Sequence, residues 1–188
     1  PADARSAFVA VRDAASAYGG HIVAIPRDNL PILCKQGTDS PLWKTQDDWT
    51  AVTPYRESAD AKVAIVSLGA PSYLAGKAAD KAAGLGTPTD VYIVNGFPIQ
   101  EEFMARVTKR YRRLLTIEDG LIGTPDTGLR GLAGYVATQS YGSGLALDHF
   151  GISNPQVAPS EHFVDVWRHF GMTEEALVQT LVPGSTDS

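Results

Sequence analysis

The sequence predicts an α/β fold, a three-layer sandwich with a mostly parallel five-stranded sheet. From residue 61 onward, short apolar segments alternate with segments of helical periodicity. The apolar segments are nearly continuous, which is typical of parallel strands that helices cover on both faces. The chain of 188 residues, 44% of them hydrophobic, is large enough to bury a substantial core.

Before residue 61 the pattern is less regular. Asp3 is predicted to cap a first helix, which ends at the Gly19-Gly20 pair. "HIVAIP" (21–26) has the composition of a short buried strand that Pro26 stops. Most of the segment that follows is rich in Pro, Asp, Ser and Thr, and only "WTAVTPYRE" looks extended. The first helix has apolar residues at three- and four-residue spacing, namely Ala7, Phe8, Val11, Ala15 and Tyr18.

The regular region is expected to hold four strands and five helices. Right-handed crossovers would bring every strand-to-helix loop to one edge of the sheet. Ser160 and Thr173 are predicted to open the last two helices, and acids follow Thr173 in its first turn. The expected strands are 62–70, 90–97, 113–119 and 145–152, and the helices between them are 71–85, 99–111 and about 129–139.

Charge and composition exclude several classes of protein. The net charge is −5, and the basic cluster "KRYRR" (109–113) is short and sits at a predicted helix end, which disfavours a nucleic-acid partner. No run of about 18 apolar residues is present for a membrane span. The single cysteine, Cys34, permits no internal disulfide, and this favours a cytoplasmic location. Its thiol is expected to be buried or incidental. Because the chain starts "PAD" without Met, we expect a processed or trimmed chain or a fragment.

Tests for nucleotide and hydrolase motifs fail. The glycines at 120, 123, 128, 131 and 134 are spaced three, five, three and three apart, so they do not form the G-x-G-x-x-G fingerprint. A Walker A loop and a G-x-S-x-G elbow are absent. Nicotinamide, P-loop and serine-triad chemistry are therefore disfavoured.

Glu118 and Asp119 carry the strongest local signal, because functional side chains of open α/β sheets lie at the carboxyl ends of strands. Neighbouring side chains on a strand point to opposite sides, so the two acids have different roles. One is expected to accept hydrogen bonds from loop amides, and the other to cap the turn or the next helix. A catalytic role is the weaker alternative.

Other polar residues are candidates for contact with an anion or a partner. The amino end of a helix offers free N–H groups to a small anion, which would involve Gly120, Gly128 and Arg130. His149 is placed after a strand, as a candidate ligand contact.

The remaining histidines are weighed as metal ligands. His162 and His169, with Asp165 between them, lie on one predicted helix and could hold a metal, although an amphipathic surface is the favoured interpretation. His21 is interpreted as structural.

Four stretches in order resemble the end of a transketolase-type thiamine-diphosphate enzyme. "AIPRDNLPIL" (24–33) is similar to the segment that closes the pyrimidine-binding domain in transketolases, where an Arg and an "NLP" triplet precede a linker. Residues 62–81 and 90–120 resemble the first strands and helices of the C-terminal domain, with its paired acids, and 151–181 resembles its closing pattern. The resemblance implies a tail of the pyrimidine-binding domain (1–33, last helix and strand), a linker (34–60) and a transketolase C-terminal-like domain (61–188).

The family's cofactor machinery has no counterpart in this sequence. A Gly-Asp-Gly element followed by Asn residues, which holds Mg²⁺ and the diphosphate in the family, is missing, and "TPDT" (124–127) extends the glycine-rich loop. The resemblance therefore implies that this chain has no catalytic residue and binds neither thiamine diphosphate nor a metal, whereas the intact enzyme uses thiamine diphosphate and Mg²⁺.

The expected function follows from the resemblance. The chain would be a C-terminal structural and assembly domain, inactive alone, of an enzyme that transfers ketol units between sugar phosphates, and it would contact other domains or subunits in a homo-oligomer. A deoxyxylulose-phosphate synthase or a 2-oxo acid dehydrogenase E1 component is an alternative within the family. A stand-alone domain that binds a small anion or a nucleotide for regulation is the alternative of another class, and a nicotinamide oxidoreductase is a third.

Overall fold

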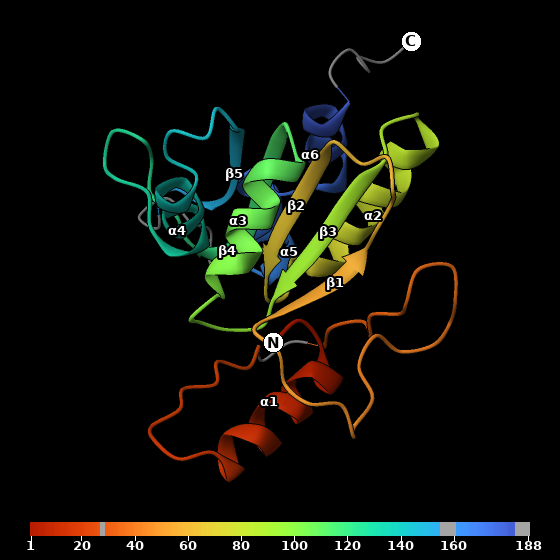
Figure 1. Cartoon of the computed structure of the whole chain (residues 1–188), viewed down its shortest axis with the longest axis vertical. Coiled ribbons are helices and arrows are strands. Elements are labelled where there is room, and N and C mark those ends of the chain that lie inside the picture. The colour runs from red at the N-terminus through yellow and green to blue at the C-terminus, as the bar shows by residue number, and fades with distance from the viewer. Residues whose placement is uncertain (27–28, 155–160, 183–188) are drawn as a thin grey trace.

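A computed structural model describes residues 1–26, 29–154 and 161–182. Its centre is a five-stranded sheet of order β1-β3-β2-β4-β5 (Figure 1). β1 is antiparallel to β3, and all other neighbours are parallel, so the predicted mostly parallel sheet is confirmed. The strands are β1 Val52–Arg56, β2 Val63–Leu68, β3 Thr89–Val94, β4 Arg113–Leu121 and β5 Ala146–Ile152.

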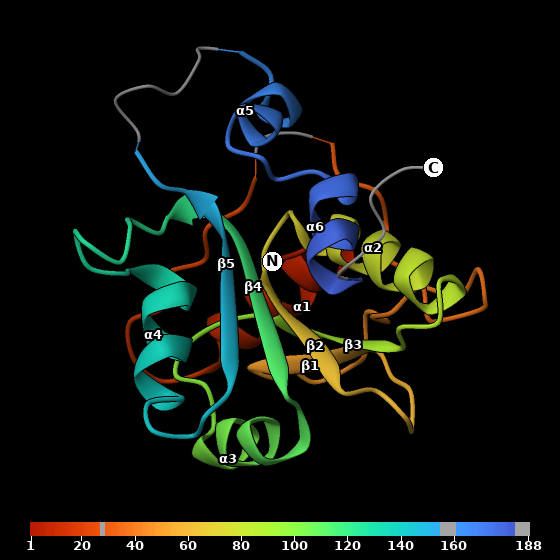
Figure 2. The same cartoon turned by 90° about the horizontal axis from the view of Figure 1, so that it is seen from above.

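Helices cover both faces of this sheet, which gives the predicted three layers (Figure 2). One apolar core joins α2, α5 and α6 to one face, and a second core joins α3 and α4 to the other. No helix of the described residues combines the length and the apolar character that crossing a bilayer requires. The helices are α1 Ala4–Ser16, α2 Ser72–Gly84, α3 Glu101–Arg110, α4 Gly131–Gln139, α5 Phe163–His169 and α6 Glu174–Leu181.

The two-sided burial of the central strands explains their continuous apolar sequence. All six residues of β3 are buried. In β4, Leu114 packs in the core beneath α3 and α4, whereas Leu115 packs in the core beneath α2 and α6. Because side chains alternate along a strand, only a run of apolar residues can fill both cores.

The chain reverses direction across the sheet between β2 and β4. From β2 it crosses to β3 on one side, and from β4 it crosses to β5 on the other. The carboxyl ends of β2 and β4 therefore flank a topological switch point, the place where open α/β sheets form a crevice.

The structure confirms one of the two helix caps predicted near the C-terminus and does not describe the other. Thr173 caps α6 as predicted, because its hydroxyl accepts a hydrogen bond from the Ala176 N–H at 3.2 Å. Ser160 lies outside the described residues, and α5 begins at Phe163 with His162 at the N-cap position.

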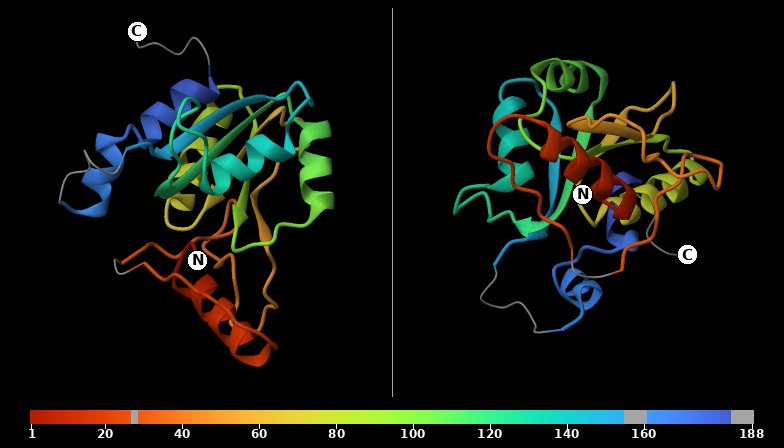
Figure 3. Two further views of the ribbon diagram at one scale, coloured as in Figure 1. Left: turned by 90° about the vertical axis from the view of Figure 1, so that its left-hand side faces the viewer. Right: turned by 90° about the horizontal axis from the view of Figure 1, so that it is seen from below.

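The N-terminal arm, which we define as residues 1–26, departs from prediction. α1 forms and Asp3 caps it through a capping box with Ser6. However, Phe8 and Val11 remain 52% and 44% exposed, so much of the apolar face expected to meet a core is uncovered. Figures 1 and 3 show α1 below the sheet, beyond the carboxyl ends of β2 and β3.

The strand predicted at 21–26 is wrong. This segment forms no strand in the structure, and Ile22 is 99% exposed. A strand requires a hydrogen-bonded neighbour, and no described segment pairs with residues 21–26. The apolar composition of the segment is thus present without the partner that would bury it.

The segment predicted as a linker fastens the arm to the sheet domain. Trp43 is buried in the core beneath α2, as is Leu33 just before this segment, and β1 lies within the segment and joins the sheet. The guanidinium of Arg12 donates to the carbonyls of Thr45 and Asp47. Except for an isolated bridge between Cys34 and Pro41, residues 34–51 contain no helix or strand.

A buried polar network at the amino edge of the sheet explains the basic cluster 109–113. Asp90 is fully buried, and its carboxylate accepts from the Ser58 N–H at 2.7 Å, from the Tyr111 hydroxyl at 2.5 Å and from Arg110 at 2.8 Å. Burial, reinforced by Asp90, strongly raises the pKa of Tyr111. Arg110 and Tyr111 of the cluster are therefore structural. Nothing in the sequence pattern indicated this network, because its members lie far apart along the chain.

Candidate functional site

The paired acids lie at the carboxyl end of β4, beside the switch point, and they diverge as predicted. Glu118 shares a face of β4 with Leu114 and Thr116, the face that α4 covers, and Asp119 points to the opposite face. The pairing of β4 with β5 shifts register between Ile117 and Leu121. Such an irregularity re-aims side chains at the end of a strand.

Glu118 is an internal acceptor for the amino end of α4. It is 3% exposed. Its Oε1 accepts a hydrogen bond from the Ala133 N–H at 2.9 Å, and the Leu132 N–H also bonds to the carboxylate. These amides are the ones that a helix start leaves without partners. Glu118 therefore caps the next helix, which is one of the two roles expected for the pair of acids.

Gly131 makes room for this carboxylate. Its φ is +58°, and a Cβ at this position would lie 2.4 Å from Oε2 of Glu118. Gly120 is also close, because its Cβ would lie 3.1 Å from the same oxygen. The glycines of this region thus serve the packing of one acid side chain.

Burial shifts the protonation of Glu118. Desolvation raises the pKa of its carboxyl above the ordinary value, and the hydrogen bonds from Ala133 and Leu132 oppose that rise. The neighbouring Asp119 adds to the rise. The pKa of Asp119 is itself raised by desolvation, and the amino group of Pro1 opposes the change.

The loop before α4 closes on itself. The Arg130 N–H donates to the Ile122 carbonyl at 2.9 Å, and the hydroxyls of Thr124 and Thr127 bond to each other at 2.9 Å. Gly128, with φ +86°, and the side chain of Arg130 are on the exposed part of the loop. The loop is exposed, whereas the amides that an anion would need are held by Glu118.

His149 lies within β5 and not after it, because the strand runs on to Ile152. It is opposite Thr116 on β4, and its Nδ1 is 2.8 Å from the Thr116 hydroxyl. Burial lowers the pKa of this imidazole, although Asp148 opposes the change. Since Thr116 faces α4, His149 lies across the sheet from Asp119, and the two do not meet.

The candidate metal ligands of α5 have local partners, whereas His21 does not take the structural role expected for it. Asp165 pairs with Arg168 one helical turn on, and the rings of His162 and His169 contact Phe163 and Phe170. His21 is exposed on the arm segment that forms no strand.

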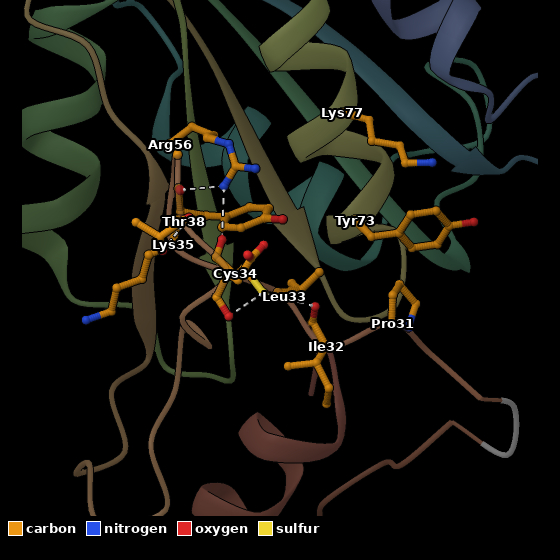
Figure 4. Close-up of a pocket in the computed structure, with 12 residues that line it drawn as sticks. Pro31, Ile32, Leu33, Cys34, Lys35, Thr38, Arg56, Tyr73 and Lys77 are labelled. Atoms are coloured by element: carbon orange, nitrogen blue, oxygen red, sulfur yellow. Dashed lines mark hydrogen bonds between the residues drawn. The ribbon is translucent and has the colours of Figure 1, made fainter.

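Cys34 lines an open cavity of about 490 Å³ between the linker, β1 and α2 (Figure 4). Its thiol lies 3.6 Å from the Asp39 carbonyl, and Arg56 donates to the carbonyl of Cys34 itself at 3.4 Å. Tyr73 and Lys77 of α2 border the same cavity. The thiol is half-buried and has no base beside it among the described residues, which agrees with an incidental role.

A larger cavity lies at the switch point. It has a volume of about 910 Å³ and separates the arm from the carboxyl edge of the sheet. The sheet contributes 68–70, 95–97 and Asp119, and the arm contributes most of 20–26 together with part of α1. We call this cavity the arm groove. Sequence reasoning missed it because it depends on the contact between two distant parts of the chain.

The amino end of α4 does not fit the diphosphate of thiamine diphosphate. The amides at the amino end of α4 are bonded to Glu118, and its carboxylate would repel a diphosphate at that place. Across residues 1–26, 29–154 and 161–182, no group of three His, Cys, Asp or Glu side chains is arranged to hold a metal ion.

Comparison with known proteins identifies similar folds. No protein-family model matches the sequence, and no curated protein matches it. A split-gene transketolase, described as an inactive tetramer of four β chains, superposes with a TM-score of 0.78 at 20% identity, over 96% of this chain and 55% of that one. A transketolase variant from Pichia stipitis gives 0.64 at 18% identity, over 96% of this chain and 24% of that one. The transketolase of Campylobacter jejuni gives 0.51 at 17% identity, over 70% and 18%.

This chain thus spans about half of the split-gene protein and a quarter or less of the other two. At such identities the comparison establishes the fold alone. The fold is that of a transketolase C-terminal-like α/β domain.

Proposed function

We propose that this chain is the C-terminal structural and assembly part of a transketolase-like enzyme that depends on thiamine diphosphate. The observation that carries the proposal is the match to a split-gene transketolase over 96% of this chain. The match includes the arm and the linker as well as the sheet domain, which supports the interpretation of 1–33 as the tail of a pyrimidine-binding domain.

The chain contributes support, and other parts of the enzyme contribute chemistry. Thiamine diphosphate with Mg²⁺ would be held elsewhere and would supply carbanion chemistry next to a carbonyl. Here the acid at the strand end is used to fix α4, and the Asp90 network fixes the opposite edge. A rigid support matters because displacements of about 1 Å at a reacting centre cost catalysis steeply.

Self-association is part of the proposal. The similar split-gene protein is described as a tetramer of β chains that is inactive. By analogy, this chain forms a homo-oligomer and needs further domains or subunits for activity. Its single cysteine favours the cytoplasm as its location.

The test is an assay of the complete enzyme, meaning this chain with every polypeptide to which it is joined or bound in its source. We expect transfer of a two-carbon ketol unit from a ketose phosphate to an aldose phosphate, dependent on thiamine diphosphate. Decarboxylation of a 2-oxo acid, with or without condensation to an aldose phosphate, would instead indicate the synthase or the E1 component.

Calorimetry on the isolated chain tests the competing class. We expect no heat of binding with phosphate, with nucleotides or with thiamine diphosphate, because Glu118 occupies the amides of the helix start. Tight binding of a nucleotide would overturn the structural role and establish a regulatory binding domain.

A further inference from the structure

The arm groove lies where open α/β sheets commonly bind small molecules. It is at the switch point between β2 and β4, and it separates two parts of the chain, the arm and the sheet domain. Ligand pockets form preferentially at such switch points and between domains. The volume of about 910 Å³ is within the range of about 300–1,000 Å³ that small-molecule sites occupy. The groove is therefore large enough for a small organic ligand.

The charged side chains that line the groove are carboxylates. Asp13 of α1 and Asp119 at the end of β4 both line it, and no Lys or Arg of the described residues does. A cleft whose charges have one sign attracts a ligand of the opposite sign. The groove therefore favours a cation and disfavours phosphates and nucleotides.

Each carboxylate has a partner, but the two partners differ in strength. Asp13 is ion-paired with Arg12 and accepts from the Trp49 N–H at 2.7 Å. Asp119 accepts a backbone hydrogen bond and faces the amino group of Pro1. Burial lowers the pKa of this amino group, which weakens it as a counter-ion. Because Asp119 is also exposed, it is the carboxylate that a ligand cation reaches.

An aromatic wall lies beyond the end of the neighbouring strand β3. Trp49 and Phe97 are 37% and 49% exposed, and both line the groove. The ring of Trp49 lies against Gly96, where a Cβ would be 2.9 Å from it. Aromatic faces bind apolar groups and attract cations. This wall therefore suits the apolar body of an organic cation.

Asn95 adds an unused acceptor to the same wall. Its amide nitrogen donates to the Thr50 carbonyl at 2.9 Å and to the Thr53 hydroxyl at 2.8 Å. This fixes the orientation of the amide, because a carbonyl only accepts. The buried Oδ1 of Asn95 has no partner among the described residues. Its partial negative charge adds to the potential of the two carboxylates.

We propose that the arm groove binds a small organic cation, an amine with an aromatic or apolar body. The ammonium group lies at Asp119, and the body lies against Trp49 and Phe97. Since β2 separates β3 from β4, the two ends of the ligand are up to two strand spacings apart, about 10 Å.

Calorimetry with 4-phenylbutylamine tests the proposal, because a butyl chain separates its ammonium group from its ring. We expect binding to the chain of 188 residues with a Kd of about 1 mM or tighter, as is ordinary for a ligand of this size. Two control compounds of similar shape, 4-phenylbutanol and 4-phenylbutyrate, lack the positive charge. We expect them to bind at least about tenfold more weakly.

Two pairs of variants locate the site. Asp119→Asn should weaken binding of the amine about tenfold, whereas Asp126→Asn, on the exposed loop before α4, should not change it. Phe97→Ala should weaken it about fivefold, whereas Leu85→Ala, at a similarly exposed site at the end of α2, should not. Cooperative urea unfolding of each variant shows that it is folded.

Fluorescence gives a second measure of location. Of the three tryptophans, Trp43 and Trp167 are buried and only Trp49 is open to a quencher. The amine should therefore reduce the quenching of tryptophan emission by acrylamide, and 4-phenylbutyrate at the same concentration should not.

Three outcomes would overturn the inference. The first is equal affinity for the amine, the alcohol and the carboxylate, and the second is unchanged affinity in both Asp119→Asn and Phe97→Ala. The third is binding to the isolated chain that is lost in the complete enzyme, which would mean that another segment fills the groove. Ketol transfer is assayed separately, so the inference and the proposed function fail independently.

Discussion

At Glu118, burial and hydrogen bonding act on one carboxyl group in opposite directions. Desolvation raises its pKa above the ordinary value, and the amides of Ala133 and Leu132 partly oppose this. As pH rises, the unfolded chain loses this proton first, so the folded state binds more protons in the window between the two pKa values. Stability contributed by this group is therefore complete below the unfolded pKa and declines as pH rises through the folded pKa.

Glu118→Gln tests that sign. Glutamine keeps an oxygen acceptor for the Ala133 N–H and does not titrate. The free energy of unfolding of the wild type, relative to the variant, should fall as pH rises from 4 to 8, by about 1.4 kcal/mol for each pH unit between the two pKa values. Urea unfolding at each pH measures it. A difference that stays constant with pH would show that the pKa of Glu118 is not perturbed.

The carboxylate of Glu118 occupies the space that a side chain at Gly131 would need. Gly131→Ala adds a Cβ 2.4 Å from the carboxylate at φ +58°, so both backbone strain and steric overlap oppose it. We expect a loss of about 2–4 kcal/mol in the free energy of unfolding. The control is Gly142→Ala, at φ +75° with no atom within 4 Å, where only the backbone strain of about 1 kcal/mol remains. Equal losses at the two positions in urea unfolding would mean that the carboxylate moves away at little cost.

Among the elements, α1 and α6 have similar caps but different surroundings. Asp3 accepts from the Ser6 N–H at 2.8 Å and from the Leu33 N–H at 2.9 Å, and Thr173 accepts from the Ala176 N–H. α6 packs into the core beneath α2, whereas much of the apolar side of α1 is exposed. The same kind of mutation should therefore have a local effect in one helix and a global effect in the other.

Asp3→Ala should loosen α1 without unfolding the sheet. Loss of the two hydrogen bonds, at about 1 kcal/mol each, should speed amide exchange in residues 6–16 about 10- to 30-fold, with the sheet amides unchanged. Thr173→Ala, the matched variant, should lower the global free energy of unfolding by about 1 kcal/mol. If Asp3→Ala lowers global stability as much as Thr173→Ala, α1 unfolds together with the sheet.

The sheet elements could be predicted because each signal was local. Continuous apolar runs specify two-sided burial, and β2, β3 and β4 formed where the runs lay. The segment 21–26 gave the same kind of signal and formed no strand. Periodicity shows that a segment has an apolar face, but it does not show what covers that face, and for Phe8, Val11 and Ile22 no described residue does.

On the scale of the whole molecule, some features of the candidate site could be predicted from local signals in the sequence and others could not. The divergence of Glu118 and Asp119 followed from strand alternation, but strand alternation did not show which of the two acids accepts from the amino end of α4. The partners of Asp90 and the arm groove depend on residues brought together from distant segments. His149 was expected at the edge of the sheet, although it lies inside the predicted strand 145–152, and in the structure it is in the middle of β5.

The difference between arm and sheet domain should be visible in limited proteolysis of the isolated chain. A protease first cleaves extended backbone that lacks hydrogen bonds. Thermolysin, which cuts before bulky apolar residues, should therefore cut first next to Ile22, Val23 or Ile25. The apolar residues of β2, β3 and β4 should resist, because they are buried in a paired sheet.

Leu85 and Tyr141 are an internal control: both are exposed, but their amides are bonded to the ends of α2 and α4. Mass spectrometry of the first fragments identifies the first cleavage sites. A first cut at Leu85 or Tyr141, or inside the sheet, would show that residues 21–26 are protected within the isolated chain.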